Sequence, residues 1–387
     1  MVKEATALND AGYAVTVVYV PLSPWADAFD KELFANKPSI NWVRAAKHPI
    51  EHPFHYKYIR LRRKGNEWWS RYMPLGDRHY EKVYVLYSQE LVKVARSIQA
   101  DLYIGHNLGA LPAAVQAARK WKAKVAFDAE DYHRGESAPG SLHYNMAVAI
   151  EDSYIPALDY LSAASPLIAQ KYQSHYPDKK TIVLNNVFGK QFLQSPATAD
   201  GEAVGLFWFS QTAGTNRGLE TVVEALNLLP QFNWSLTILG QCSDGFRQQL
   251  LGLSSMPDRI VFHSPVALGE IFPIASCFDI GLATEVPYCE NRRICLTNKL
   301  FTYLLAANCI VASDTEAQQQ FLHTYAGVGL LYKHDHIQDL ADKLTLLMQD
   351  KHLLRSCRQR AYELADGQLN WEVESIKLLD TVRSVLL

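Results

Sequence analysis

Short apolar runs rich in β-branched and aromatic residues recur along this chain, and most are separated by longer stretches in which apolar positions have helical spacing. Near-continuous apolar strands that alternate with helices predict parallel sheets covered by helices on both faces. The predicted strands lie at residues 14–20, 41–45, 101–106, 124–129, 160–165, 181–186, 205–210, 235–240, 259–264, 279–284, 308–313 and 327–332.

The length of 387 residues predicts two such cores, because a single core rarely grows beyond about 250–300 residues. Residues 188–203 lose hydrophobic periodicity and gather Gly, Pro, Ser and Ala, so we expect a linker there. The expected organisation is an N-terminal domain over 1–187 and a C-terminal domain over 204–365. A helix over 366–387 follows, for which packing back onto the N-terminal domain is one option.

Composition excludes several classes of protein. Hydrophobic residues make up 48% and charged residues 20%, which is typical of a globular protein and not of a disordered one. A net charge of -2 offers no field that would collect nucleic acid, so we expect no nucleic-acid partner. The six cysteines form no CxxC pair, and neither a signal peptide nor an apolar run of about 18 residues is present. We therefore expect a cytoplasmic protein.

A loop of small residues follows the predicted strand at 205–210, in the sequence FWFSQTAGTNRGLE. Small residues let backbone N–H groups approach an anion, and Arg217 adds positive charge near the start of the next helix. Gln211, Thr212, Gly214 and Arg217 are therefore candidate contacts to a phosphate group. The alternative is an ordinary strand-to-helix turn with a solvated arginine.

A second candidate anion site lies at the start of the helix in TNKLFTYLLA. Thr297 is the predicted N-cap, and Asn298 and Lys299 occupy the first turn. Free N–H groups, the helix dipole and the ammonium all favour a bound phosphate there.

In the loop before this helix, Glu285 and Glu290 are candidates to accept hydrogen bonds from sugar hydroxyls. The plainer alternative pairs these carboxylates with Arg292 and Arg293 at the surface.

Polar residues also follow two strands of the N-terminal domain. Asp128 lies at the end of the strand at 124–129, Glu130, Asp131 and His133 follow directly after it, and His106 ends the strand at 101–106. Carboxylates and imidazoles at the carboxyl end of a strand can hydrogen-bond an acceptor hydroxyl or take its proton. A packed or solvated histidine is the alternative for His106.

Residues 57–71 combine six basic residues and one acidic residue with Trp68 and Trp69, a net charge of +5. Such a segment can lie on an anionic membrane surface and receive a lipid-linked acceptor. The commoner explanation of a charge run is a solvated, poorly regular loop.

The pattern SQTxGxxRGLExxVEAL from Ser210, followed about eighty residues later by NKLFTYLLA and IVASD, resembles the C-terminal donor domain of retaining GT-B glycosyltransferases of the group-1 type, glycosyltransferase family 4. The sequences VLNNVF before the linker and NWE near the C-terminus add to the resemblance. It covers essentially the whole chain and is strongest over 205–315. It implies an α/β fold of the GT-B class, with two Rossmann-like doubly wound domains facing a cleft.

The resemblance also implies an activity. A retaining, hexosyltransferase-type enzyme would move a sugar from a nucleotide-sugar donor to a saccharide or lipid-linked acceptor, in cell-surface polysaccharide or glycoconjugate synthesis. Arg217 and Lys299 would stabilise the diphosphate, and His133 would act at the acceptor. We expect no metal and no other cofactor, although Asp128 and Glu130 form a D-x-E pair like the metal-binding signature of another glycosyltransferase fold.

Two departures from the family pattern leave other functions open. Thr212 stands where relatives carry an arginine, and Thr302 stands where they carry a glutamate. A nucleotide-sugar epimerase of the same fold and a catalytically degenerate partner subunit therefore remain alternatives.

The N-terminal residues 3–20 have the pattern of the first helix and second strand of a Rossmann unit, with no strand before them. The first strand of such a fold is central, so its absence predicts an N-terminal domain with two half-sheets. Either the start codon is assigned too late, or this version has lost its activity.

Overall fold

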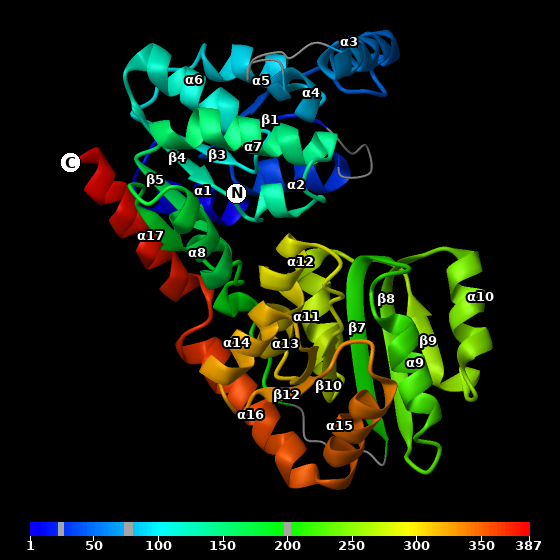
Figure 1. Ribbon diagram of the computed structural model, residues 1–387. Coiled ribbons are helices and arrows are strands. Elements are labelled where there is room, and N and C mark those ends of the chain that lie inside the picture. The colour runs from blue at the N-terminus through cyan, green and yellow to red at the C-terminus, as the bar shows by residue number, and fades with distance from the viewer. Residues whose placement is uncertain (22–26, 73–79, 197–202) are drawn as a thin grey trace. The chain divides into compact units, whose positions relative to one another are not determined.

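The computed structural model describes residues 1–21, 27–72, 80–196 and 203–387 (Figure 1). The chain divides into two compact units. Unit 1 comprises Met1–Leu184 and Ser375–Leu387, and unit 2 comprises Asn185–Glu374. The last helix, α17 (Trp371–Leu386), begins in unit 2 and ends in unit 1.

All the strands expected from the sequence are present, each within three residues of its predicted ends. Unit 1 contains β1 (Thr16–Tyr19), β2 (Asn41–Arg44), β3 (Leu102–His106), β4 (Lys124–Asp128), β5 (Tyr160–Ala163) and β6 (Thr181–Val183). Unit 2 contains β7 (Val204–Ala213), β8 (Trp234–Cys242), β9 (Ile260–His263), β10 (Ile280–Ala283), β11 (Cys309–Ser313) and β12 (Gly329–Tyr332).

Unit 2 is built on one six-stranded parallel sheet in the order β12-β11-β10-β7-β8-β9. Counted from its own first strand, this is the doubly wound order 3-2-1-4-5-6. The order reverses between β7 and β10, which are neighbours in the sheet although a long stretch of chain separates them. Ligands of such sheets bind at the carboxyl ends of these two strands.

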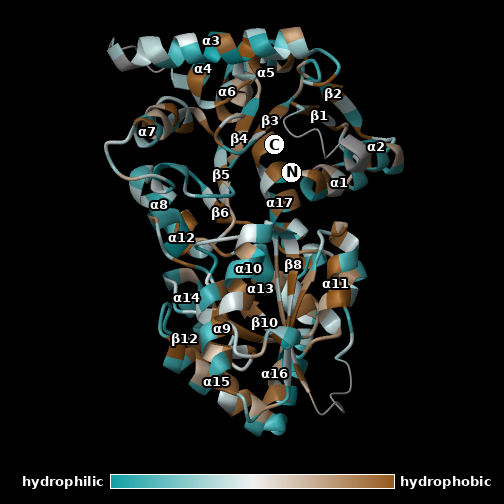
Figure 2. Cartoon of the chain, turned by 90° about the vertical axis from the view of Figure 1, so that its right-hand side faces the viewer, coloured by the Kyte–Doolittle hydropathy of each residue, from teal (hydrophilic) through white to brown (hydrophobic). Residues whose placement is uncertain are grey.

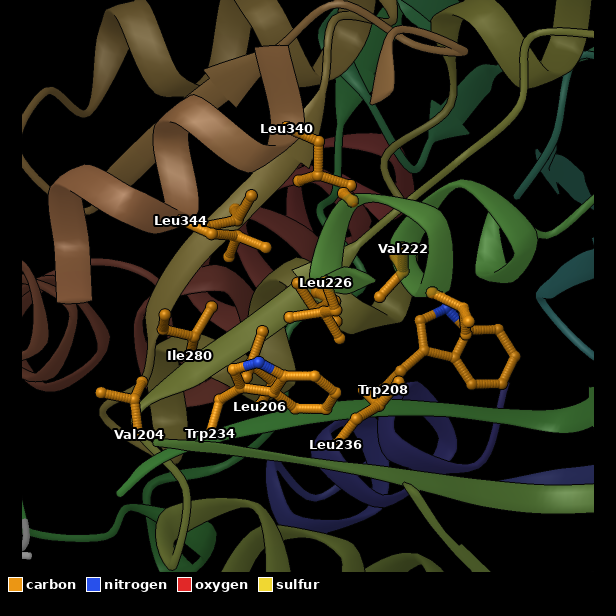
Figure 3. Packing of buried hydrophobic residues seen from close by; sticks show 14 of the residues in the cluster. Val204, Leu206, Trp208, Val222, Leu226, Trp234, Leu236, Ile280, Leu340 and Leu344 are labelled. Atoms are coloured by element: carbon orange, nitrogen blue, oxygen red, sulfur yellow. The ribbon is translucent and has the colours of Figure 1, made fainter. Parts of the chain in front are cut away.

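Helices cover both faces of this sheet. On one face, the alternating residues Val204, Leu206 and Trp208 of β7 pack against α9 (Leu219–Asn227) and α15 (Ile337–Gln349), and all three are at most 2% exposed (Figure 3). The opposite face carries Phe207 and Phe209, whose rings contact Tyr303 of α13 (Asn298–Leu305). The other helices of unit 2 are α10 (Asp244–Leu253), α11 (Leu268–Ser276), α12 (Glu290–Ile294), α14 (Glu316–Thr324) and α16 (Lys351–Gly367).

Unit 1 contains two parallel sheets that share no hydrogen-bonded strand pair among the described residues. One has the order β3-β4-β5-β6, and the other pairs β1 with β2. This agrees with the two half-sheets expected from the sequence. The helices are α1 (Val2–Asp10), α2 (Asp27–Asn36), α3 (Pro53–Tyr72), α4 (Tyr80–Tyr84), α5 (Ser88–Ala95), α6 (Leu111–Trp121), α7 (Leu142–Tyr154) and α8 (Pro166–His175).

The basic segment 57–71 is not the poorly regular loop that its charge favoured. It lies within α3, a helix of 20 residues. The helix is held to unit 1 by Ile59, which is completely buried against Ala46 and Tyr87. One buried apolar contact in a charged stretch is a weak periodic signal, which explains the error.

In the part of the chain that the structure describes, no helix combines the length and apolar character needed to cross a bilayer.

Candidate functional site

Unit 2 contains a cavity of about 350 Å³ at the carboxyl ends of β7 and β10. It is lined by residues from the loop after β7 and from the segment after β10, namely Thr215, Asn216, Arg217, Glu285, Val286, Tyr288 and Arg292. The two segments meet because the strands before them are adjacent in the sheet. The cavity therefore lies where the strand order reverses, the usual ligand site of this architecture.

The loop after β7 is fixed to the end of β10 by close contacts. Gly218 has φ +73°, and a Cβ atom there would lie 2.7 Å from the backbone oxygen of Thr284. The Thr284 hydroxyl donates a hydrogen bond of 2.6 Å to the Arg217 carbonyl and accepts one of 3.1 Å from Trp208 Nε1. These contacts hold Arg217 at the wall of the cavity.

The loop begins later than its composition suggested. β7 continues through Ser210 to Ala213, so Gln211 and Thr212 lie on the strand and not in the loop that follows it. Both side chains are exposed, and neither lines the cavity. Gly214 is the first loop residue, and a Cβ atom there would have no neighbour within 4 Å. Among the four candidates from this stretch, Arg217 alone lines the cavity.

Glu285 is a buried carboxylate in the cavity wall, 6% exposed. Its Oε1 accepts hydrogen bonds from Lys299 Nζ at 2.7 Å and from Thr297 Oγ1 at 3.2 Å. Lys299 is equally buried, and its ammonium lies 5.2 Å from the centre of the Trp208 ring. The Ser313 hydroxyl binds the Glu285 carbonyl at 2.7 Å. Glu285 is therefore held in place through both its side-chain carboxylate and its backbone carbonyl.

Positive charge keeps this carboxyl group ionised. Burial alone would raise the pKa of Glu285, but the Lys299 ammonium and its hydrogen bond outweigh burial, and Arg292 and Arg217 add to the effect. The pKa of Glu285 is consequently below its usual range. An ionised carboxylate in a cavity wall can accept hydrogen bonds from ligand hydroxyls.

The start of α13 differs from the predicted phosphate site. Thr297 occupies the N-cap position, but its hydroxyl donates to Glu285 and does not cap the helix. The Asn298 side chain accepts a hydrogen bond of 2.9 Å from Asn186 Nδ2. The Lys299 ammonium is bonded to Glu285, and neither Asn298 nor Lys299 lines the cavity.

Arg292 is a cavity residue that the sequence interpretation named only in the alternative, as an ion-pair partner of Glu285 or Glu290 at the surface. Its side chain is 31% exposed and lines the cavity together with Arg217. Its Nη1 lies 3.9 Å from Glu285 Oε2, and its Nε donates to the Tyr288 hydroxyl at 3.2 Å. No signal in the sequence separates Arg292 from Arg293, because only the fold shows which of the two faces the cavity.

The two neighbours of Arg292 in α12 have other surroundings. Arg293 forms an ion pair with Glu316, in which both side chains are about half exposed. Glu290 is the first residue of α12 and does not line the cavity. Of the two candidate sugar-binding carboxylates, Glu285 is therefore the one that lines the cavity.

In unit 1, His106 and Asp128 end the neighbouring strands β3 and β4 and are paired in register. His106 Nδ1 lies 3.1 Å from Asp128 Oδ2, and the Ser162 hydroxyl donates to Asp128 Oδ1 at 2.9 Å. The His106 side chain is 18% exposed, so its ring is partly accessible.

A second acidic group approaches this pair from α1. Glu4 Oε2 lies 3.8 Å from His106 Nε2. Burial by itself would lower the pKa of His106, but the Glu4 charge and the Asp128 hydrogen bond outweigh it and raise that pKa. Ligand atoms of Glu4, His106 and Asp128 lie within 4.8 Å of one another, which is compatible with a bound cation.

The other acceptor-side candidates lie near this cluster in the chain. Glu130 has φ +48°, and its Oε1 lies 4.0 Å from His106 Nδ1. Asp131 is half-buried. His133 is only 1% exposed, and its Nδ1 lies 2.8 Å from Glu136 Oε1. The ring of His133 thus lies in the interior, whereas the sequence interpretation placed it against an acceptor.

Comparison with solved structures finds similar proteins over the full length of the chain. Sucrose-phosphate synthase from Thermosynechococcus elongatus is 13% identical with a TM-score of 0.72, covering 99% of this chain and 91% of that one. A glycosyltransferase from Rickettsia africae is 11% identical with a TM-score of 0.69, covering 100% and 93%. Anabaena HepE in complex with UDP and glucose is 14% identical with a TM-score of 0.69, covering 99% and 96%.

The fold is that of the GT-B glycosyltransferases. At these identities the likeness concerns the fold alone. No protein-family model and no curated sequence matches the chain.

Proposed function

We propose that this protein is a glycosyltransferase that binds a nucleotide-sugar donor in the cavity of unit 2. The observation that carries the proposal is the pairing of two arginines, Arg217 and Arg292, with an ionised Glu285 around one cavity at the strand-order reversal. Two guanidinium groups suit a diphosphate, because each offers several N–H donors in a planar fork. The carboxylate suits sugar hydroxyls.

Each group has a distinct role in this proposal. Arg217 and Arg292 neutralise the charge that develops on the diphosphate as the glycosidic bond to the donor breaks. Donors fixed in advance stabilise such charge without reorganising during the reaction. Lys299 acts through Glu285, because its ammonium keeps that carboxylate ionised and in place. Lys299 is therefore a positioning residue.

On the acceptor side, we assign the His106 and Asp128 pair of unit 1 to acceptor binding or to proton removal from an acceptor hydroxyl. His106 is the more exposed of the two candidate histidines, and Asp128 orients its ring. A histidine held by a carboxylate is a common general base. In this proposal His133 has a structural role and does not contact the acceptor, because its ring is buried.

The finer assignments follow the sequence resemblance. They are retention of configuration, a hexosyl donor, a saccharide or lipid-linked acceptor, and a place in polysaccharide or glycoconjugate synthesis in the cytoplasm. No metal is required in this proposal, since the arginines supply the positive charge at the diphosphate. UDP is the first nucleotide to test, because HepE was solved with UDP and glucose.

The test measures UDP and UDP-glucose binding by isothermal titration calorimetry with the full chain. Arg217→Gln and Arg292→Gln should each weaken binding by about 10–150-fold, which is the loss of one charge-assisted hydrogen bond to phosphate. Arg293→Gln is the matched control, because Arg293 is in the same helix as Arg292 but pairs with Glu316. It should leave the affinity unchanged.

Three outcomes separate the alternatives. Turnover of the donor that requires an added saccharide or lipid-linked acceptor supports the transferase, whereas turnover without acceptor indicates an epimerase. Tight binding with no turnover indicates a degenerate partner subunit. If no nucleoside diphosphate or nucleotide sugar binds, the proposed donor site is wrong.

A further inference from the structure

Helix α3 presents an apolar stripe to the outside of unit 1. The stripe consists of large side chains that are 84%, 59%, 71%, 59% and 72% exposed, namely Phe54, Tyr58, Leu61, Trp68 and Tyr72. Their spacings of four, three, seven and four residues place them on one face of the helix. At 1.5 Å per residue the stripe is about 27 Å long.

The opposite face of α3 fixes the helix to unit 1. Ile59 is fully buried, Arg63 Nε donates to the Val83 carbonyl at 2.9 Å, and Arg62 binds both carboxylate oxygens of Glu90 at 2.9 Å. Figure 2 shows α3 beside α4 at the edge of unit 1. The helix is anchored by its polar and buried side, so the stripe faces outward as a consequence of tertiary packing.

Cations border the stripe along one side. Lys57, Arg60 and Lys64 are exposed, and they project about 60–120° from the centre of the stripe on a helix of 3.6 residues per turn. The segment 57–71 carries a net charge of +5 in a chain whose net charge is -2. Part of this charge, that of Arg62 and Arg63, faces unit 1, whereas Lys57, Arg60 and Lys64 lie beside the exposed apolar residues.

Aromatic side chains dominate the stripe and its other border. The Trp68 ring lies 5.2 Å from the Tyr72 ring and 6.3 Å from the ring of Trp69, which is 44% exposed. Trp and Tyr favour the interfacial layer of a bilayer, because their rings are apolar and carry one polar group. Lys and Arg beside them reach the lipid phosphates.

We propose that α3 binds the surface of an anionic lipid bilayer, with the apolar stripe in the interfacial layer and the basic border against the headgroups. The cations lie at the border of the stripe, where they complement the negative charge of the headgroups. The proposal depends on unit 1 alone and is independent of the donor site in unit 2.

The test is sedimentation of the full chain with vesicles of phosphatidylcholine and phosphatidylglycerol at about 3:1, compared with vesicles of phosphatidylcholine alone. The wild type should bind the anionic vesicles more strongly, and added salt should weaken that binding. Leu61→Gln with Trp68→Gln should lower the partition coefficient at least about tenfold. Lys57→Gln with Lys64→Gln should lower it about 25-fold, or about fivefold for each charge.

The matched control is Leu346→Gln with Ile376→Gln, which removes two side chains 44% and 56% exposed on other helices. It should bind vesicles like the wild type. All the substituted residues are exposed, and circular dichroism checks that the fold is kept. Absence of wild-type binding to anionic vesicles, or equal binding by the α3 variants, refutes the proposal. Concentration-dependent dimers that only the stripe variant abolishes also refute it, because they would make the stripe an interface between copies.

Discussion

The ion pair between Lys299 and Glu285 offers the sharpest test of how unit 2 is built. Replacing Lys299 by Met keeps the length and apolar stem of the side chain but removes the ammonium that lies 2.7 Å from Glu285 Oε1. Both residues are 6% exposed, so bulk water compensates poorly for the lost partner. A buried carboxylate would remain with only Arg292 and Arg217 to oppose its desolvation.

Breaking a buried ion pair by removing one partner costs about 3–5 kcal/mol. For a unit of about 190 residues, from Asn185 to Glu374, this corresponds to a decrease of about 6–20 °C in the melting temperature. The double variant Lys299→Met with Glu285→Gln should recover much of the loss, because it leaves no buried charge. The loss of stability in Lys299→Met should therefore depend on the presence of the Glu285 carboxylate.

The loss of stability in Lys299→Met should also depend on pH. In the wild type the folded pKa of Glu285 is lowered, so its contribution to stability is present above the unfolded pKa and is lost as pH falls through the lower folded pKa. In Lys299→Met the folded pKa of Glu285 should rise, since the strongest opposing charge is gone. The difference in stability between the two proteins should be greatest at neutral pH and should shrink in acid.

Urea denaturation at neutral and acidic pH, followed by circular dichroism, measures these differences. Lys190→Met is the matched control, because Lys190 forms an ion pair with Asp366 at 2.9 Å at the surface. The Lys190 side chain is 41% exposed and that of Asp366 is 51% exposed. That change should cost less than about 1 kcal/mol. A penalty for Lys299→Met as small as the control, or one that is the same at both pH values, would show that Lys299 does not hold Glu285 ionised.

Two other positions give direct tests. Gly218→Ala should destabilise the protein by about 1–3 kcal/mol in chemical denaturation, because the residue has φ +73° and its Cβ would lie 2.7 Å from Thr284. Gly214→Ala, where a Cβ meets nothing within 4 Å, should cost less than about 1 kcal/mol, and equal costs would contradict this account of the loop. Asp128→Asn should lower the pKa of His106 in an NMR titration, since it removes a charge that raises that pKa. The stability that a raised His106 pKa provides, present below the unfolded pKa and lost as pH rises through the folded one, should decrease with it.

The strands and the fold class could be predicted from local patterns. Each strand is a short apolar run rich in β-branched residues, whereas the segments between strands are longer and have helical periodicity. The helix α3 could not be predicted in the same way. Its largest apolar residues face outward, and only Ile59 is fully buried, so its periodicity does not indicate a core-facing helix.

Among the residues at the cavity, too, some could be predicted from the sequence and others could not. Arg217 was predictable because it follows a strand and a loop of small residues, which is a local pattern. Arg292 was not, since the choice between it and Arg293 depends on how α12 is oriented against the end of β10. Lys299 was identified as a charged group of the site, but its partner Glu285 was not predictable from sequence spacing.

Local chemistry in the chain was enough to define its strands, its alternating helices and the classes of residue that can bind a phosphate. Side-chain periodicity and turn composition act between near neighbours, so they are readable without a structure. The adjacency of β7 and β10, and with it the meeting of Arg217, Glu285 and Arg292 at one cavity, was decided by the tertiary fold. Strand order depends on how whole helices pack against the sheet, and no short stretch of sequence contains that information.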